Sequence, residues 1–252
     1  MLKKRIIPSL LLKDNRMVKS VRFENFRDTG HPLTAARIYD AQRVDELVVL
    51  DIFASREGRG IHADVVTQMS EECFMPLCVG GGIRSVESIR MLIGKGADKV
   101  AITTAAVECE GFLQEAARIF GSANIVVGID VRAGRHGGYE VFVRGGTQAT
   151  GLDPVVWARK AQELGAGELF LTSIDRDGTM EGLDIPLIRS VVDAVTIPVI
   201  AAGGVGTLDD FRIGMEEGGA SAVSAASIFH FTDQSPIKVR KYLVDRGVHV
   251  RA

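Results

Sequence analysis

The segment Pro76–Ala105, PLCVGGGIRSVESIRMLIGKGADKVAITTA, recurs later in the chain as Pro198–Ser227, PVIAAGGVGTLDDFRIGMEEGGASAVSAAS. The two copies are offset by 122 residues at their starts, which is about half of the 252-residue chain. Each copy reads as a short apolar strand, a glycine-rich turn, an amphipathic helix and a second short strand that ends in small hydroxyl residues. Repeated units of this kind predict a parallel β-sheet.

The glycines after the first strand of each copy allow two interpretations. Without a Cβ atom they let backbone N–H groups approach an anion, and the following helix adds the positive end of its dipole. They also suit a tight turn between a strand and a helix. A hydroxyl residue one unit later in both copies favours phosphate binding. The expected phosphate-binding residues are Gly81, Gly82 and Thr104 in the first copy, and Gly203, Gly204 and Ser227 in the second.

The alternation of strand and helix extends over the whole chain. Strands are predicted to begin near Arg5, Glu46, Pro76, Lys99, Asn124, Glu168, Pro198 and Ala222. Helices are predicted over Pro32–Gln42, His62–Glu72, Ser85–Gly94, Gly111–Phe120, Pro154–Leu164, Ile185–Ala194, Thr207–Glu217 and Pro236–Arg246. Eight units in about 250 residues predict an α/β fold, a single (βα)8 TIM barrel with half-barrels at about 1–123 and 124–252 and an active site at the C-terminal ends of the strands.

Composition and charge narrow the classes of function. With 46% hydrophobic residues the chain can bury a large core, and a net charge of −2 gives no basic surface for nucleic acid. No apolar run reaches the ~20 residues needed to span a bilayer, so we expect a cytoplasmic protein without membrane contact. The three cysteines, Cys73, Cys78 and Cys109, cannot form a disulfide framework, and we expect none of them to be a nucleophile.

Two segments that follow predicted strands exceed the usual length of a connection. Lys13–Gly30 follows the first strand, and Arg132–Gly151 follows the fifth and contains an apparent hairpin. Long loops at this face of a barrel are usually lids or substrate clamps. The first segment is basic, so it either closes over an anionic substrate or is a solvated surface loop. Its basic residues are Lys13, Arg16, Lys19 and Arg22, of which Lys19 is the expected substrate contact.

Several predicted strands begin with a charge directly before the apolar run. The four residues are Arg5, Glu46, Lys99 and Glu168. Alternate residues of a closed barrel point inward, so two basic and two acidic groups are expected to meet across its N-terminal end. One such charge is ordinary in water, whereas four of mixed sign indicate a salt-bridged gate at the barrel axis.

The chain as a whole resembles the cyclase subunit family of imidazole glycerol phosphate synthase. The resemblance rests on KRIIP, FENFRD, DELVVLDI, VGGGIRSVE, GADKVAI, GAGELFLTSIDRDGT, AASIFHF and GVHVR. It implies a heterodimer with a separate glutaminase subunit, whose ammonia enters through the charged ring and reaches a bisphosphate substrate held by the two glycine-rich turns. In this family two aspartates, at the ends of strands one and five, carry the cyclase chemistry.

The sequence departs from this family at one of the two aspartates. Asp130 ends the fifth strand and matches the family's general acid or base, whereas Leu11 stands where the first strand should carry the other aspartate. Leucine cannot transfer a proton, so the cyclase step is in doubt. Other departures from the family are Ser9, Leu12, Asn15, Ser20, Thr103 and Ala202.

Three functions remain open at this point. The first is a paralogue that keeps the partner, the ammonia path and the phosphorylated substrate class but delivers ammonia to another acceptor, as in sugar amidation for surface polysaccharides. The second is an ordinary cyclase of histidine biosynthesis that tolerates Leu11. The third is a non-catalytic barrel that activates the glutaminase. Leu11 favours the first, and retention of the ring and both turns disfavours the third.

The remaining acids at the predicted active face have less certain roles. Asp51 and Asp177 are expected to bind substrate hydroxyls or support Asp130, together with Gly178, while Asp175 and Asp177 could instead hold a turn. His230 is expected to make a structural contact near the partner face or the last helix. No second histidine lies at metal-ligand spacing from it, so we expect neither a metal nor another cofactor.

Overall fold

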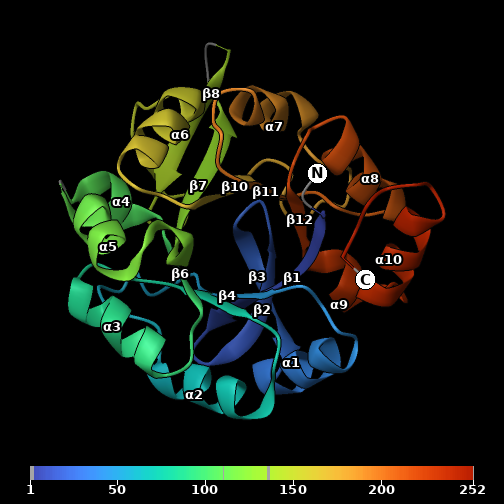
Figure 1. Ribbon diagram of the computed structural model, residues 1–252, viewed down its shortest axis with the longest axis horizontal. Helices are drawn as coiled ribbons and strands as arrows, with labels where there is room; N and C mark the ends of the chain where they lie inside the picture. Colours follow the sequence, from blue (N-terminus) through green and yellow to red (C-terminus); the bar gives the residue numbers. More distant parts are fainter. Residues whose placement is uncertain (1–2, 110, 135–136, 252) are drawn as a thin grey trace.

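The structure is a computed structural model that describes residues 3–109, 111–134 and 137–251. Eight parallel strands close into a barrel and helices surround it (Figure 1). The barrel strands are β1 (Arg5–Lys13), β4 (Leu47–Asp51), β5 (Leu77–Gly80), β6 (Lys99–Ile102), β7 (Ile125–Ala133), β10 (Glu168–Ser173), β11 (Val199–Ala202) and β12 (Ala222–Ala225). Closure is direct because β1 pairs with both β12 and β4. The predicted TIM barrel is confirmed.

The eight predicted helices are present, each with ends within two residues of the expected ones. They are α1 (Pro32–Ala41), α2 (Ala63–Glu72), α3 (Val86–Gly94), α5 (Phe112–Phe120), α6 (Pro154–Glu163), α7 (Ile185–Val192), α8 (Leu208–Glu216) and α10 (Pro236–Val244). Three short helices were not predicted: α4 (Thr104–Glu108), η1 (Ser122–Asn124) and α9 (Ser227–Phe231). Side-chain caps fix several starts; Asp153, for example, accepts the N–H groups of Val155 and Val156.

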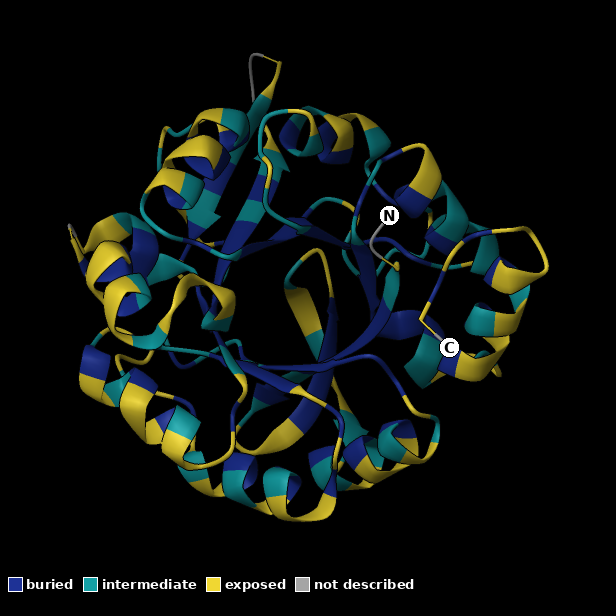
Figure 2. Cartoon of the chain, in the orientation of Figure 1, coloured by how far each residue is buried: buried dark blue, intermediate teal, exposed yellow. Residues whose placement is uncertain are grey.

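Two apolar layers hold the barrel together. The larger layer lies between the strands and the helices, and the smaller one fills the barrel interior. In β1 the alternation is visible, because Ile6 and Leu10 belong to the outer layer and Ile7 to the inner one. Figure 2 shows the strands of the barrel largely buried and the outward faces of the helices exposed. In the part of the chain that the structure describes, no helix has both the length and the apolar character needed to cross a membrane.

The segment Lys13–Gly30 is not the loop that the sequence suggested. It continues β1 as an antiparallel extension, formed by β2 (Arg16–Val21) and β3 (Glu24–Gly30). The turn between β1 and β2 consists of Asp14 and Asn15 with φ of 50° and 59°, a conformation that these two residue types tolerate well. The later segment, in contrast, contains the predicted hairpin, as β8 (Tyr139–Val143) and β9 (Gln148–Ala149).

Four charged side chains meet at the N-terminal end of the barrel. Arg5 pairs with the carboxylates of Glu46 and Glu168, and Lys99 Nζ lies 2.9 Å from Glu46 Oε2 and 2.9 Å from Glu168 Oε2. Burial lowers the pKa of Lys99, but the charges of the two carboxylates outweigh it, so this pKa lies above its ordinary value. The expected convergence is thus observed as a ring of alternating charge. Its use as an ammonia gate stays a prediction.

We expect Lys99→Met to lower the free energy of unfolding by about 3 kcal/mol, because Arg5 alone would then face two buried carboxylates. The measurement is denaturant unfolding at neutral pH. Lys241→Met, on the exposed side of α10, is the matched control and should change the stability by less than about 0.5 kcal/mol. Equal stability of the two variants would show that the ring does not hold the barrel.

Candidate functional site

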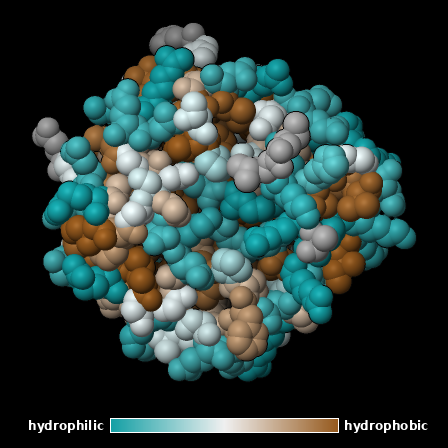
Figure 3. Space-filling model, viewed as in Figure 1, coloured by the Kyte–Doolittle hydropathy of each residue, from teal (hydrophilic) through white to brown (hydrophobic). Residues whose placement is uncertain are grey.

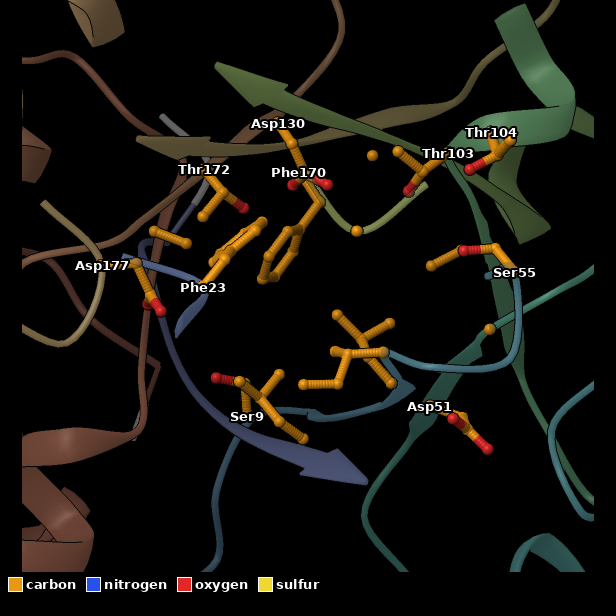
Figure 4. A pocket seen from close by; sticks show the side chains of 18 of the residues that line it. Ser9, Phe23, Asp51, Ser55, Thr103, Thr104, Asp130, Phe170, Thr172 and Asp177 are labelled. Carbon is orange, nitrogen blue, oxygen red and sulfur yellow. The ribbon is translucent and has the colours of Figure 1, made fainter. Parts of the chain in front are cut away.

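A cavity of about 330 Å³ opens at the C-terminal ends of the barrel strands. The structure brings together in its wall every expected catalytic, substrate-binding and phosphate-binding residue. These are Lys19, Asp51, Gly81, Gly82, Thr104, Asp130, Asp177, Gly178, Gly203, Gly204 and Ser227. Figure 4 shows the rings of Phe23 and Phe170 projecting into the same cavity as Asp130 and Thr172. Apolar and polar groups therefore face the same cavity.

Asp130 is the acid best suited to proton transfer in this cavity. Burial raises its pKa to about 7, helped by the negative charge of Asp177 and opposed by a hydrogen bond with Thr172, its neighbour in register on β10. Asp177 itself is held by Lys19, whose Nζ lies 2.6 Å from its Oδ2. A carboxyl group with a pKa near 7 exists in both protonation states at neutral pH, as a general acid or base must.

The strand opposite Asp130, β1, contributes Leu11 and Ser9 to the cavity wall and no carboxyl group. β1 and β7 are four strands apart in the closed order of eight, so Leu11 and Asp130 lie on opposite sides of the barrel mouth. Leu11 is paired in register with Leu50, which also lines the cavity. Among the other departures from the family, Ser9, Ser20, Thr103 and Ala202 line the cavity, Leu12 lies in the outer core and Asn15 lies in the first hairpin turn.

Asp51 has a structural task at the cavity edge. Its Oδ1 accepts the N–H groups of Phe53 at 3.1 Å and Ala54 at 3.0 Å, and its other oxygen is bound by Arg59. These contacts shape the turn after β4. The carboxylate is therefore largely occupied by the protein, which favours support of the cavity wall over direct binding of a substrate hydroxyl.

Asp175 holds the loop after β10 against the end of β7. Its Oδ2 accepts the N–H of Ala133 at 2.8 Å, and it does not line the cavity. The turn of the β2–β3 hairpin reaches the same loop, since Arg22 donates its backbone N–H to the carbonyl of Asp177 at 2.7 Å. The hairpin thereby carries Lys19 over the cavity and fixes it there.

The two glycine-rich turns are equivalent in geometry. A Cβ atom at Gly82 would lie 1.8 Å from the carbonyl oxygen of Arg59, and one at Gly204 would lie 2.1 Å from that of Gly182. The tight-turn interpretation therefore holds at both sites. Phosphate binding remains open as well, because among the described residues neither Gly82 nor Gly204 donates its N–H to a backbone or side-chain acceptor.

Sequence reasoning missed three arginines beside the first turn, Arg56, Arg84 and Arg144, which also line the cavity. Arg144 comes from the β8–β9 hairpin, and its backbone N–H donates to Thr104 Oγ1 at 3.0 Å. Arg56 in turn donates to the carbonyl of Arg144. The sequence did predict the hairpin that carries Arg144. The length of that hairpin, however, did not indicate which barrel strands its tip would contact.

The cysteines and histidines form no further centre in the described ranges. Cys73 and Cys78 are buried, and burial raises the pKa of both thiols, whereas Cys109 is exposed at the cavity rim. His230 lies on α9, at the C-terminal side of the barrel and close to the start of α10. No group of three His, Cys, Asp or Glu side chains is arranged to hold a metal ion in these ranges.

The comparison with protein families agrees with this architecture. The family model described as "Histidine biosynthesis protein" matches residues 5–235, from the first residue of β1 to the start of α10. The matched part contains all eight barrel strands, the charged ring and the whole cavity wall. The chain therefore belongs to the histidine biosynthesis protein family.

Proposed function

We propose that this protein is the barrel subunit of a glutamine-dependent amidotransferase pair. A separate glutaminase subunit would release ammonia at the N-terminal end, and the barrel would pass it to an acceptor in the cavity. The acceptor we propose lies outside histidine biosynthesis, such as a phosphorylated sugar derivative destined for a surface polysaccharide. The observation that carries this proposal is that Asp130, the cavity acid whose pKa is raised to about 7, faces Leu11 on the opposite strand of the barrel.

Two unpaired oxygen atoms support passage of ammonia. Glu46 Oε1 in the ring and Ser224 Oγ in the barrel wall are buried and have no hydrogen-bond partner among the described residues. Ser224 belongs to β12 and also lines the cavity. Ammonia donates hydrogen bonds, so these two acceptors offer it one contact near the ring and one at the floor of the cavity.

An exposed aromatic side chain supports a partner at the N-terminal end. Phe74 precedes β5 and is 91% exposed, although its backbone is fixed: Asp40 Oδ1 accepts the N–H groups of Phe74 at 2.8 Å and Met75 at 3.0 Å. A rigid exposed aromatic residue is typical of an interface anchor. In the face shown in Figure 3 polar side chains predominate and apolar ones form separate patches.

The cyclase of histidine biosynthesis is the second candidate. The retained cavity wall, with Lys19, Asp130 and Asp177 in it, favours it. It would require one proton donor and one acceptor, and the wall that carries Leu11 offers neither. A barrel that only activates the glutaminase is the third candidate, but such a role would not need a proton-transfer group with a pKa of about 7 in a cavity.

The two glycine-rich turns should each bind a phosphate in crystals grown with inorganic phosphate. Ser227→Ala should empty the second turn and leave the first occupied, because its hydroxyl belongs to that turn alone. Ser190→Ala, in α7 and away from the cavity, is the matched control and should change neither. A phosphate-soaked structure with both turns empty would remove the phosphate-binding role.

Purified protein should form little or no imidazole glycerol phosphate from the histidine-pathway bisphosphate and ammonium salt. Excess ammonium bypasses the glutaminase, so the result reports on the cavity alone. Leu11→Asp should raise turnover by two orders of magnitude or more, the usual worth of a general acid or base. Leu50→Asp, the same change at the neighbouring position in register, should not.

A wild-type turnover in the typical range of about 1 to 1,000 per second would establish the cyclase and remove the proposal of another acceptor. If the wild type is inactive, the proposed pair is then tested with the glutaminase subunit of the same organism, measuring ammonia release with and without the barrel. If the barrel does not stimulate the glutaminase, both the proposed amidotransferase pair and the role as a non-catalytic activator are contradicted.

Phe74→Ala should weaken the complex with that glutaminase subunit at least tenfold in Kd, measured by calorimetry, because truncating an anchor removes its buried contact area. Phe231→Ala makes the same change at the C-terminal side, where Phe231 is 52% exposed, and should leave the affinity unchanged. If the two substitutions change the Kd equally, Phe74 is not an anchor for the partner.

A further inference from the structure

The two glycine-rich turns differ in the charge that surrounds them. Three of the arginines that line the cavity, Arg56, Arg84 and Arg144, lie on the side of the first turn. On the side of the second turn, the cation among the described cavity-lining residues is Lys19, whose Nζ lies 2.6 Å from Asp177 Oδ2. The first turn is therefore the more positive end of the cavity.

Two of the three arginines are not neutralised by an acid. Arg144 is neutralised by Glu108, because its Nε and Nη2 donate to the two carboxylate oxygens at 2.8 Å and 3.0 Å. Arg56 and Arg84 form no ion pair with a carboxylate of the described residues. Both are exposed and line the cavity, so a ligand can reach them.

Contacts with uncharged groups hold the guanidinium group of Arg56 in place. Its Nε donates to the carbonyl oxygen of Arg144 at 3.1 Å, and its Nη2 donates to that of Gly145. The same group lies over the ring of Phe53, 5.4 Å from its centroid. A guanidinium group has five N–H donors, so three are left for a ligand. Because its position is already fixed, little conformational entropy is lost when a ligand binds.

The backbone of Arg144 places Arg56 beside the hydroxyl group of the first turn. The N–H of Arg144 donates to Thr104 Oγ1 at 3.0 Å, and the carbonyl oxygen of the same residue accepts from Arg56. Since Thr104 Oγ1 accepts a hydrogen bond, its own hydrogen is left to donate to an anion. The hydroxyl group and the guanidinium group are thus one residue of the hairpin apart. Arg84 lies two residues after Gly82.

We infer that Arg56 and Arg84 form an anion subsite beside the first turn, and that the cavity takes a ligand with two directly linked phosphate groups. One phosphate would accept from the turn and from Thr104, and the other from the two guanidinium groups. Guanidinium groups suit this task because their paired N–H donors match the oxygens of a phosphate. The inference rests on the proposed function, in which the acceptor is phosphorylated, and narrows that acceptor to a diphosphate.

The test is calorimetric titration of the full-length protein with inorganic pyrophosphate and, separately, with inorganic phosphate, in metal-free buffer at neutral pH and constant ionic strength. Pyrophosphate should bind with a Kd of about 1 mM or tighter, and at least tenfold more tightly than phosphate. Uridine 5′-diphosphate, which is esterified at one end, distinguishes two sources of the diphosphate. Binding as tight as that of pyrophosphate, or tighter, assigns the subsite to a diphosphate ester, and weaker binding assigns it to free pyrophosphate.

Arg56→Met and Arg84→Met each remove one guanidinium group and keep an unbranched side chain. Each should weaken pyrophosphate binding at least tenfold and phosphate binding less than threefold, because the phosphate held by the turn keeps its other donors. Arg176→Met is the matched control, since Arg176 lies beside Gly204 at the second turn and does not line the cavity. It should change both affinities by less than twofold. Thermal unfolding identifies a variant that does not fold, and the other variant then decides.

The inference is overturned if pyrophosphate binds no more tightly than phosphate, or if the folded Arg56 and Arg84 variants lose no more affinity than Arg176→Met. Neither result bears on the transfer of ammonia, because the assay of glutaminase stimulation contains no diphosphate. Conversely, a barrel that binds pyrophosphate through both arginines but does not stimulate the glutaminase would contradict the proposed function and leave the subsite in place.

Discussion

Closure of the parallel sheet is the constraint on which the rest of this structure depends. β1 pairs with β12 on one side and β4 on the other, so within the described part of the chain each of the eight barrel strands has a pairing partner on both sides. Closure also gives the two ends of the barrel different surroundings. Strand starts converge at one end, where four charges pair, and strand ends converge at the other, where the cavity opens. Residues far apart in sequence become neighbours only through this geometry.

The fold and much of the cavity wall could be predicted because their signals are local and repeated. Apolar runs and turn glycines recur in each unit, and the strand-end rule of the barrel then assigns positions such as Asp130 and Gly204 to one face. The four residues of the charged ring could be predicted for the same reason, because each lies at the start of a strand. Pairing between particular ring residues, in contrast, depended on barrel closure and side-chain reach.

What could not be predicted depends on contacts between units. The basic segment Lys13–Gly30 reads as a loop because its charges interrupt the alternation of a strand, yet Met17, Val18, Lys19 and Ser20 are all buried once it folds over the barrel. The hydrogen bonds of Asp51 could not be predicted because its partners, two backbone N–H groups and Arg59, lie in a turn without a regular pattern.

The charge balance around Asp130 limits the chemistry that the cavity can perform. Asp177 raises the pKa of Asp130, but Lys19 pairs with Asp177, so Asp130 remains the only acid in the upper barrel whose pKa is brought to about 7 in the described chain. A single group of this kind moves one proton at a time. Ring cleavage with cyclisation needs a donor and an acceptor on opposite walls. In the proposed transfer of ammonia, one carboxyl group can accept the proton that nitrogen loses when it bonds to carbon and then donate it to the oxygen that leaves that carbon. Leu11 supplies no such group on the opposite strand, and this supports the proposed transfer of ammonia over the cyclase reaction.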